Sequence, residues 1–116
     1  MPEHPTSDWT SQLRRGVLEL CVLSLLRTRE SYGYEIVTTL ERFGPLAAGE
    51  NTIYPLLRRL KTDRHLETFA VDSPTGPPRQ YFRLTRIGRA RLETLELEWT
   101  DMADAVARCL NEGVAS

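Results

Sequence analysis

The sequence contains few of the residues from which metal sites, disulfides and catalytic centres are built. Two cysteines and two histidines occur among 116 residues. Cys21 and Cys109 lie among apolar neighbours, with no second Cys or His at metal-ligand spacing, so we expect neither a zinc site nor a disulfide framework. His4 and His65 have no acid, base or nucleophile as a plausible partner. The sequence therefore predicts that the protein is not an enzyme and binds no cofactor. Unpaired cysteines are typical of a reducing, cytoplasmic compartment.

Long hydrophobic runs and a targeting segment are also missing. The richest apolar stretch, Gly16–Leu26, is too short to span a bilayer and contains Glu19. The opening residues, MPEHPTSDWTSQ, lack the basic-then-apolar order of a secretion signal. We therefore expect no membrane partner.

Net charge is close to zero, but the charge is unevenly distributed. The chain has a formal net charge of −1. Residues 51–91 carry nine basic and three acidic side chains, a net charge of +6. The net charge is −2 for residues 1–50 and −5 for residues 92–116. A cationic middle beside an acidic tail predicts a localised surface for a polyanion. The length is that of one domain.

Residues 51–66, NTIYPLLRRLKTDRHL, predict an amphipathic helix with a basic outer face. Four apolar residues recur at helical spacing and must pack on a core: Ile53, Leu56, Leu57 and Leu60. The other side carries Asn51, Pro55, Arg58 and Thr62, flanked by Tyr54, Arg59 and Lys61. Asn51 or Thr52 is the expected N-cap, which places Pro55 in or just after the first turn. Such a face is suited to contacts with phosphates and base edges. The alternative interpretation is a solvated basic face on an ordinary amphipathic helix.

Two more helices are expected before this one. Residues 1–7 have no apolar pattern and predict a loose arm. A first helix, capped by Ser7 or Asp8, reaches about Arg29, and its apolar residues are numerous enough to be buried on several sides: Leu13, Val17, Leu20, Cys21 and Leu25. Ser31 begins a short second helix, in which Tyr34 is expected to be mostly packed and which Gly44 and Pro45 end. The second helix and the basic helix then form a helix-turn-helix.

After residue 66 the apolar period changes from helical to alternating. TFAVD and QYFRLT predict two strands, with SPTGPPR as the turn of a β-hairpin. A last helix, capped by Thr85, runs towards Asn111. Its apolar residues follow a heptad seam: Leu92, Leu95, Trp99, Met102, Val106 and Cys109. No later element in the chain can cover this seam, so we expect it to pack on a second copy in a homodimer. The predicted fold class is mainly α with a small β-hairpin.

Four motifs in this order resemble the PadR-like transcriptional regulators: LRRGVLELCVLSLL, SYGYEI, NTIYPLLRRL and GPPRQYFRLTRIG. The resemblance covers about residues 13–99 and implies a winged helix-turn-helix with a C-terminal dimerisation helix. The expected units are an arm (1–7), the DNA-binding domain (8–84) and the dimerisation helix (85–112). This sequence departs from the family by having Asn51 before the threonine of TIYP and His65 where glycine ends the recognition helix. Histidine tolerates the left-handed conformation required there.

The resemblance implies a repressor that binds a palindromic operator in double-stranded DNA as a homodimer, and in some members is released by a small hydrophobic or aromatic effector. The DNA-binding set is then the polar face of the basic helix together with the hairpin residues Gly76 and Arg79. Leu95, Trp99 and Met102 are the expected effector-binding residues, although plain packing of Trp99 on the partner's first helix is the alternative. A module that binds only protein would need an apolar or acidic surface in place of Arg58, Arg59 and Lys61.

Overall fold

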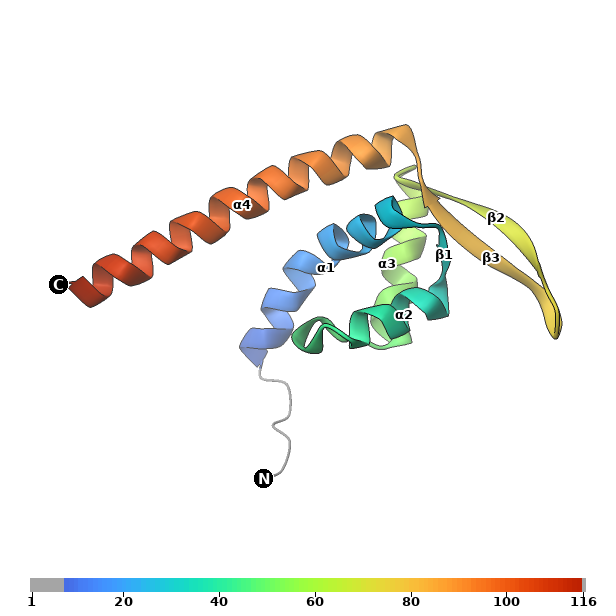
Figure 1. Cartoon of the computed structure of the whole chain (residues 1–116), viewed down its shortest axis with the longest axis horizontal. Helices are drawn as coiled ribbons and strands as arrows, with labels where there is room; N and C mark the ends of the chain where they lie inside the picture. The colour runs from blue at the N-terminus through green and yellow to red at the C-terminus, as the bar shows by residue number, and fades with distance from the viewer. Residues whose placement is uncertain (1–7, 116) are drawn as a thin grey trace, which may run out of the picture.

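The computed structural model describes residues 8–115, which form a compact helical domain, a projecting β-hairpin and a long C-terminal helix (Figure 1). The predicted arm and Ser7 lie outside the described residues. In chain order the elements are α1 (Asp8–Thr28), β1 (Ser31–Tyr32), α2 (Gly33–Glu41), the 3-10 helix η1 (Gly44–Leu46), α3 (Glu50–Thr62), β2 (Leu66–Ser73), β3 (Gly76–Leu84) and α4 (Arg86–Ala115).

The apolar core lies between α1, α2, α3 and the base of the sheet. The predicted stripe of α3 is confirmed, because Ile53, Leu57 and Leu60 are fully buried and Leu56 packs against them. From the other elements the core receives Leu18, Val22, Leu23, Leu26, Ile36, Val37, Leu40, Leu66, Leu84 and Leu92. Burial of these large aliphatic side chains is the main stabilising contribution to the fold.

The first helix is covered on more than one side, as expected, but it is fully buried on one face only; Leu20, Cys21 and Leu25 are partly buried against the same core. Its core face consists of Leu18, Val22, Leu23 and Leu26. The residues singled out from the sequence lie on another face, where Leu13 is 48% exposed and Val17, Leu20, Cys21 and Leu25 are half-buried. An apolar helix face left partly open in one chain is available to a second chain.

A three-stranded antiparallel sheet replaces the expected two-stranded hairpin, with strand order β1-β3-β2. Ser31 and Tyr32, predicted as the start of a helix, pair instead with Phe82 and Tyr81 of β3. The hairpin is also longer than predicted, because Ser73 pairs with Gly76 and leaves a two-residue tip. Residues 76–79, which were assigned to the turn, therefore belong to β3.

Both ends of α3 differ in detail from the prediction. Gly49, not Asn51 or Thr52, is the N-cap, and its carbonyl accepts hydrogen bonds from the backbone N–H groups of Thr52 and Ile53 (both 3.0 Å). Pro55 consequently lies in the second turn and removes the N–H that would bond to the carbonyl of Asn51.

The helix ends in a Schellman motif. The residue in the left-handed conformation is Arg64 (φ 67°), not His65. The N–H of His65 donates to the carbonyl of Leu60 (2.9 Å), and that of Arg64 donates to the carbonyl of Lys61 (3.0 Å). The chain therefore leaves the recognition helix one residue earlier than the sequence suggested.

The last helix begins as predicted, since the hydroxyl of Thr85 accepts a hydrogen bond from the backbone N–H of Gly88 (3.0 Å). It continues past Asn111 to Ala115 and projects beyond the domain (Figure 1). Leu92 is 1% exposed within its own core, which contradicts its assignment to a dimer interface. The order of helices with a β-hairpin wing is the predicted winged helix-turn-helix.

Candidate nucleic-acid interface

The outer face of α3 is exposed, as a recognition surface requires. Of its predicted contact residues, Tyr54 is half-buried and the others are exposed: Asn51, Thr52, Pro55, Arg58, Arg59, Lys61 and Thr62. Within residues 8–115, neither Arg58 nor Lys61 forms an ion pair with a carboxylate, whereas Arg59 approaches Glu19 at 3.4 Å and Asp63 at 3.8 Å. Arg58 and Lys61 are thus the α3 cations most available to an anion.

A hollow of about 300 Å³ separates the middle of α3 from the wing. It brings together Arg58 of α3 and Arg79 of β3, two residues that the sequence assigned to different elements of the same interface. Tyr32, Tyr34 and Gln80 line the same hollow. Tyr34 is 54% exposed, so the expectation that it is mostly packed was wrong. Its position at the start of a short helix, next to a missed strand, explains the error.

The outer face of the wing carries a ladder of aromatic rings with a guanidinium at each end. Arg79 lies 4.6 Å from the ring centroid of Tyr32, and Arg83 lies 4.6 Å from that of Phe69. Between them, the ring of Tyr81 is 5.3 Å from Tyr32 and 5.8 Å from Phe69. Such stacking is favourable and restricts the Arg79 side chain, whose charge remains exposed. The predicted wing residue Gly76 is exposed beside the hairpin tip.

Tyr54 packs inward more than expected. A Cβ added to Gly33 would lie 2.6 Å from Cε1 of the Tyr54 ring, so the absence of a side chain at Gly33 allows this contact. Burial, together with the charge and hydrogen bond of Glu50, raises the pKa of the Tyr54 phenol. The phenol therefore stays protonated near neutral pH, but its acidic neighbour makes it a poorer phosphate donor than Arg58.

Glu19 of α1 connects the recognition helix to the C-terminal helix. Its carboxylate accepts a hydrogen bond from Nε of Arg91 (2.9 Å) and lies 3.4 Å from Arg59, while its side chain is only 15% exposed. Burial opposes ionisation of Glu19, but the hydrogen bonds and charges of Arg91 and Arg59 outweigh that effect and lower its pKa. We call Glu19, Arg59 and Arg91 the Glu19 bridge; sequence reasoning missed it because its members are far apart in the chain.

The lowered pKa of Glu19 predicts an acid-sensitive contribution to stability. The contribution is present above the unfolded-state pKa, near the ordinary 4.5, and is lost as the pH falls through the lower folded-state pKa. Glu19→Gln should therefore cost about 1 kcal/mol near neutral pH, a value limited by the exposure of both arginines, and much less in acid. Urea unfolding at neutral and acidic pH measures both values. Asp104→Asn, in an exposed pair with Arg108, is the control. A deficit that persists unchanged in acid would contradict the assignment.

One stripe of the exposed part of the C-terminal helix is apolar. Past the buried Leu92 and the half-buried Leu95, Trp99 is 45%, Met102 60% and Val106 48% exposed, and the predicted interface residue Cys109 is exposed as well. Leu110, which the prediction did not include, continues the same stripe and is 65% exposed. In Figure 1 the distal half of α4 extends away from the other helices and from the sheet.

An apolar cavity of about 280 Å³ lies between the open face of α1 and the C-terminal helix. Its lining includes Trp99 and, from α1, Leu13, Val17, Leu20 and Cys21. Burial raises the pKa of the Cys21 thiol, which keeps it in the unreactive protonated form. Leu95 and Met102, the other predicted effector-binding residues, do not line the cavity in this single chain.

Neither a metal-ligand group nor a membrane-spanning helix is found among residues 8–115. Among them no group of three His, Cys, Asp or Glu side chains is placed to hold a metal ion. None of the helices in residues 8–115 is long and apolar enough to cross a membrane.

Comparisons with known proteins agree on one family. The family described as "Transcriptional regulator PadR-like family" matches residues 22–94. A PadR-like transcriptional regulator from Bacillus cereus superimposes with a TM-score of 0.78 at 35% identity, over 85% of this chain and 96% of that one. A PadR family regulator from Eggerthella lenta gives 0.77 at 38%, over 85% and 86%. An uncharacterised protein from Lysinibacillus sphaericus is 30% identical over 83% of this chain and 90% of its own length.

Proposed function

The chain belongs to the PadR-like family of transcriptional regulators, and from that premise we propose that it is a homodimeric repressor of a palindromic operator, controlled by a small aromatic effector. The observation that carries the DNA-binding proposal is the hollow between α3 and the wing, with Arg79 on one wall and, on the other, Arg58, which pairs with no carboxylate among residues 8–115. The members of this family and the solved structures compared above are transcription regulators rather than enzymes.

In this proposal α3 enters the major groove and the wing follows the phosphate backbone. Arg58 points away from the buried stripe of α3 and suits bidentate recognition of guanine. Lys61, one turn further along the helix, suits a phosphate. Arg79 is held on the wing by stacking on Tyr32, so its charge is positioned for backbone contact rather than base recognition.

Two alanine substitutions separate these roles. Arg58→Ala should weaken the operator complex by about 1 to 3 kcal/mol and reduce discrimination against random DNA, because a base contact is lost. Arg79→Ala should weaken operator and random DNA alike and reduce the slope of log affinity against log salt concentration by about 1. Fluorescence anisotropy over a salt series measures both effects.

The matched control for these substitutions is Arg108→Ala, which removes an exposed cation on the distal part of α4. It should change neither the affinity nor the salt dependence. Equal losses on operator and random duplex for Arg58→Ala would remove Arg58 from base recognition.

The homodimer is proposed from two apolar surfaces that one chain leaves open. The first is the distal stripe of α4, comprising Trp99, Met102, Val106 and Leu110. The second is the open face of α1 beside the cavity at Trp99. We propose that the distal stripe of one protomer packs on α4 and the open α1 face of the other, since each surface is a helix face that water otherwise covers at a free-energy cost.

Effector binding is proposed at Trp99, where the apolar cavity leaves room for a flat ligand beside the large indole ring. Planar aromatic compounds should quench Trp99 fluorescence saturably and weaken operator binding over the same concentration range. The measurement requires Trp9→Phe, because Trp9 is 70% exposed and emits as well. Trp99→Leu should abolish ligand sensitivity; because Trp99 also belongs to the proposed dimer stripe, its operator affinity without ligand and its sedimentation are measured alongside. If no compound in a chemically varied panel quenches saturably, Trp99 serves as interface packing instead.

A further inference from the structure

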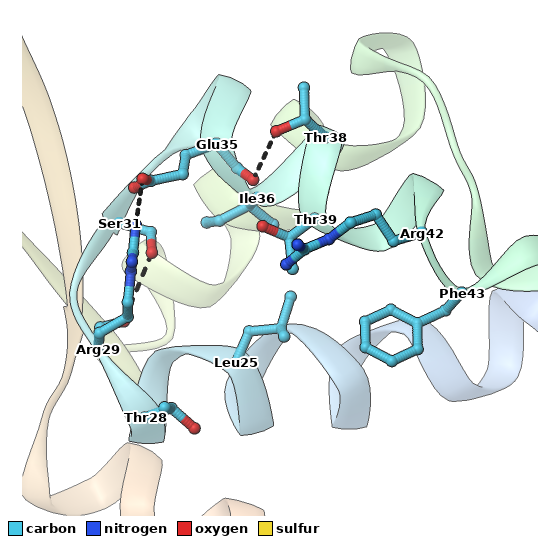
Figure 2. A pocket seen from close by; sticks show the side chains of 10 residues that line it. All are labelled: Leu25, Thr28, Arg29, Ser31, Glu35, Ile36, Thr38, Thr39, Arg42 and Phe43. Atoms are coloured by element: carbon cyan, nitrogen blue, oxygen red, sulfur yellow. Dashed lines mark hydrogen bonds and ion pairs between the residues drawn. The ribbon is translucent and has the colours of Figure 1, made fainter.

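A second, more polar pocket lies between the C-terminal end of α1, β1 and one face of α2 (Figure 2). Its volume of about 550 Å³ is within the range of small-molecule sites. It shares no lining residue with the α1 cavity described above, whereas a neighbouring pocket of about 280 Å³, also lined by Trp99, shares Leu25 and Phe43 with it. None of the predicted DNA-binding residues lines it.

One wall of the pocket contains a carboxylate oxygen without a partner. Oε2 of Glu35 pairs with the guanidinium of Arg29, whereas Oε1 is buried and accepts no hydrogen bond from any described residue. Oε1 itself is closed to solvent, while the Glu35 side chain lines the pocket and is 24% exposed, so a donor in the pocket reaches Oε1 once the carboxylate turns towards it. A buried acceptor of this kind is stabilised by a donor that enters the pocket, most strongly by a charged one.

A cation lies further along the same helix. The side chain of Arg42 runs back along α2, so that its guanidinium lies beside Thr39 in the pocket (Figure 2). Within residues 8–115, Arg42 forms no ion pair with a carboxylate, which leaves a planar donor for an incoming anion. Opposite α2, Leu25 and Phe43 supply an apolar floor.

We propose that this pocket binds a free amino acid with an apolar side chain. The ammonium group donates to Oε1 of Glu35, the carboxylate pairs with Arg42, and the side chain packs against Leu25 and Phe43. A simple amine would leave Arg42 unpaired, and a simple carboxylic acid would leave Oε1 of Glu35 without a donor. A zwitterion satisfies both groups and adds no net charge to the pocket.

The position of the pocket gives such a ligand a route to the DNA-binding face. The ligand would connect the end of α1 to α2, and α2 packs directly on α3 through the core. Stabilisation of this arrangement by a bound amino acid would bias the orientation of the recognition helix. The site therefore offers a metabolic input that is separate from the proposed aromatic effector.

The test compares L-phenylalanine with two analogues that each lack one charged group. After a thermal-shift screen of the apolar L-amino acids, isothermal titration calorimetry is performed with the best amino acid and its analogues; for phenylalanine these are 3-phenylpropanoate and 2-phenylethylamine. We expect saturable binding of the amino acid, with each analogue weaker by about tenfold or more because one charge-assisted contact is lost. Absence of saturable binding by any apolar amino acid up to about 10 mM would overturn the proposal.

Variants assign each charged group to its contact. Glu35→Gln should weaken binding of the amino acid and the amine by about tenfold but not of the carboxylic acid, because it also frees the cation of Arg29 in the same pocket. Arg42→Gln should weaken binding of the amino acid and the carboxylic acid but not of the amine. Glu41→Gln, an exposed neighbour outside the lining, is the matched control. Equal losses for all three ligands in either variant would indicate a damaged fold and refute the assignment. Loss of amino-acid binding in Trp99→Leu would place the ligand in the other cavity and refute it as well.

Discussion

Deletion of residues 102–116 is expected to give a folded monomer whose affinity for a palindromic operator is lower by about 100-fold or more. The cut removes Met102, Val106 and Leu110, which are exposed in one chain, and keeps everything that anchors α4 to its own domain. The anchors are the buried Leu92, the pair of Arg91 with Glu19 (2.9 Å) and the pair of Arg27 with Glu96 (2.9 Å). Deletion from residue 89 onward would instead remove part of the core and unfold the domain.

Sedimentation and binding to duplexes with one or two half-sites measure the two consequences separately. The affinity for a single half-site should change little, because the loss comes from the linkage of two domains and not from their DNA contacts. In the full-length chain, Val106→Glu should also give a monomer. Leu97→Glu is its matched control, because Leu97 is 73% exposed but lies on the opposite side of α4. If the truncated chain still sediments as a dimer, the open face of α1 carries the interface without α4.

Gly88→Ala is expected to destabilise the domain by about 3 kcal/mol. A Cβ at this position would lie 2.0 Å from the backbone carbonyl oxygen of His65, and a backbone atom cannot turn aside as a flexible side chain can. The same carbonyl accepts a hydrogen bond from the N–H of Thr85 (3.1 Å), so the displacement would also disturb the start of α4. Urea unfolding followed by circular dichroism gives the free energy of unfolding.

The control for Gly88→Ala is Gly16→Ala in α1. Nothing lies within 4 Å of a Cβ built at Gly16, so alanine there should stabilise the helix by up to about 1 kcal/mol through its higher helix propensity. A stability for Gly88→Ala within about 0.5 kcal/mol of the parent would show that α4 can shift away from His65 at little cost.

Periodicity identified the helices well where one face alone is buried. The stripe of α3 was predicted residue by residue, and the Thr85 cap marked the start of α4, because both signals depend on neighbours within a few positions of the chain. The strand β1 was missed because Ser31 and Tyr32 are too short a segment to show alternation, and its hydrogen bonds depend on β3, which lies far along the chain.

The α4 seam shows a second limit of sequence patterns. Leu92 and Val106 occupy the same heptad stripe, yet Leu92 packs in its own core while Val106 is exposed. A repeat reports that a helix face is apolar and does not report which chain covers it. For the same reason the polar face of α3 did not reveal that Arg59 is held by Glu19, a residue of α1.

The Glu19 bridge connects the base of α4 to the recognition helix, so a small tilt of α4 at this point is amplified along its length. A helix of 30 residues is about 45 Å long, so a tilt of about 10° at its base displaces the far end by roughly 8 Å. That displacement is about a quarter of the roughly 34 Å between half-sites one turn of DNA apart. In the proposed homodimer, the stiffness of the anchors at the base of α4, the Glu19 bridge among them, thus affects how accurately the two protomers match the distance between their half-sites.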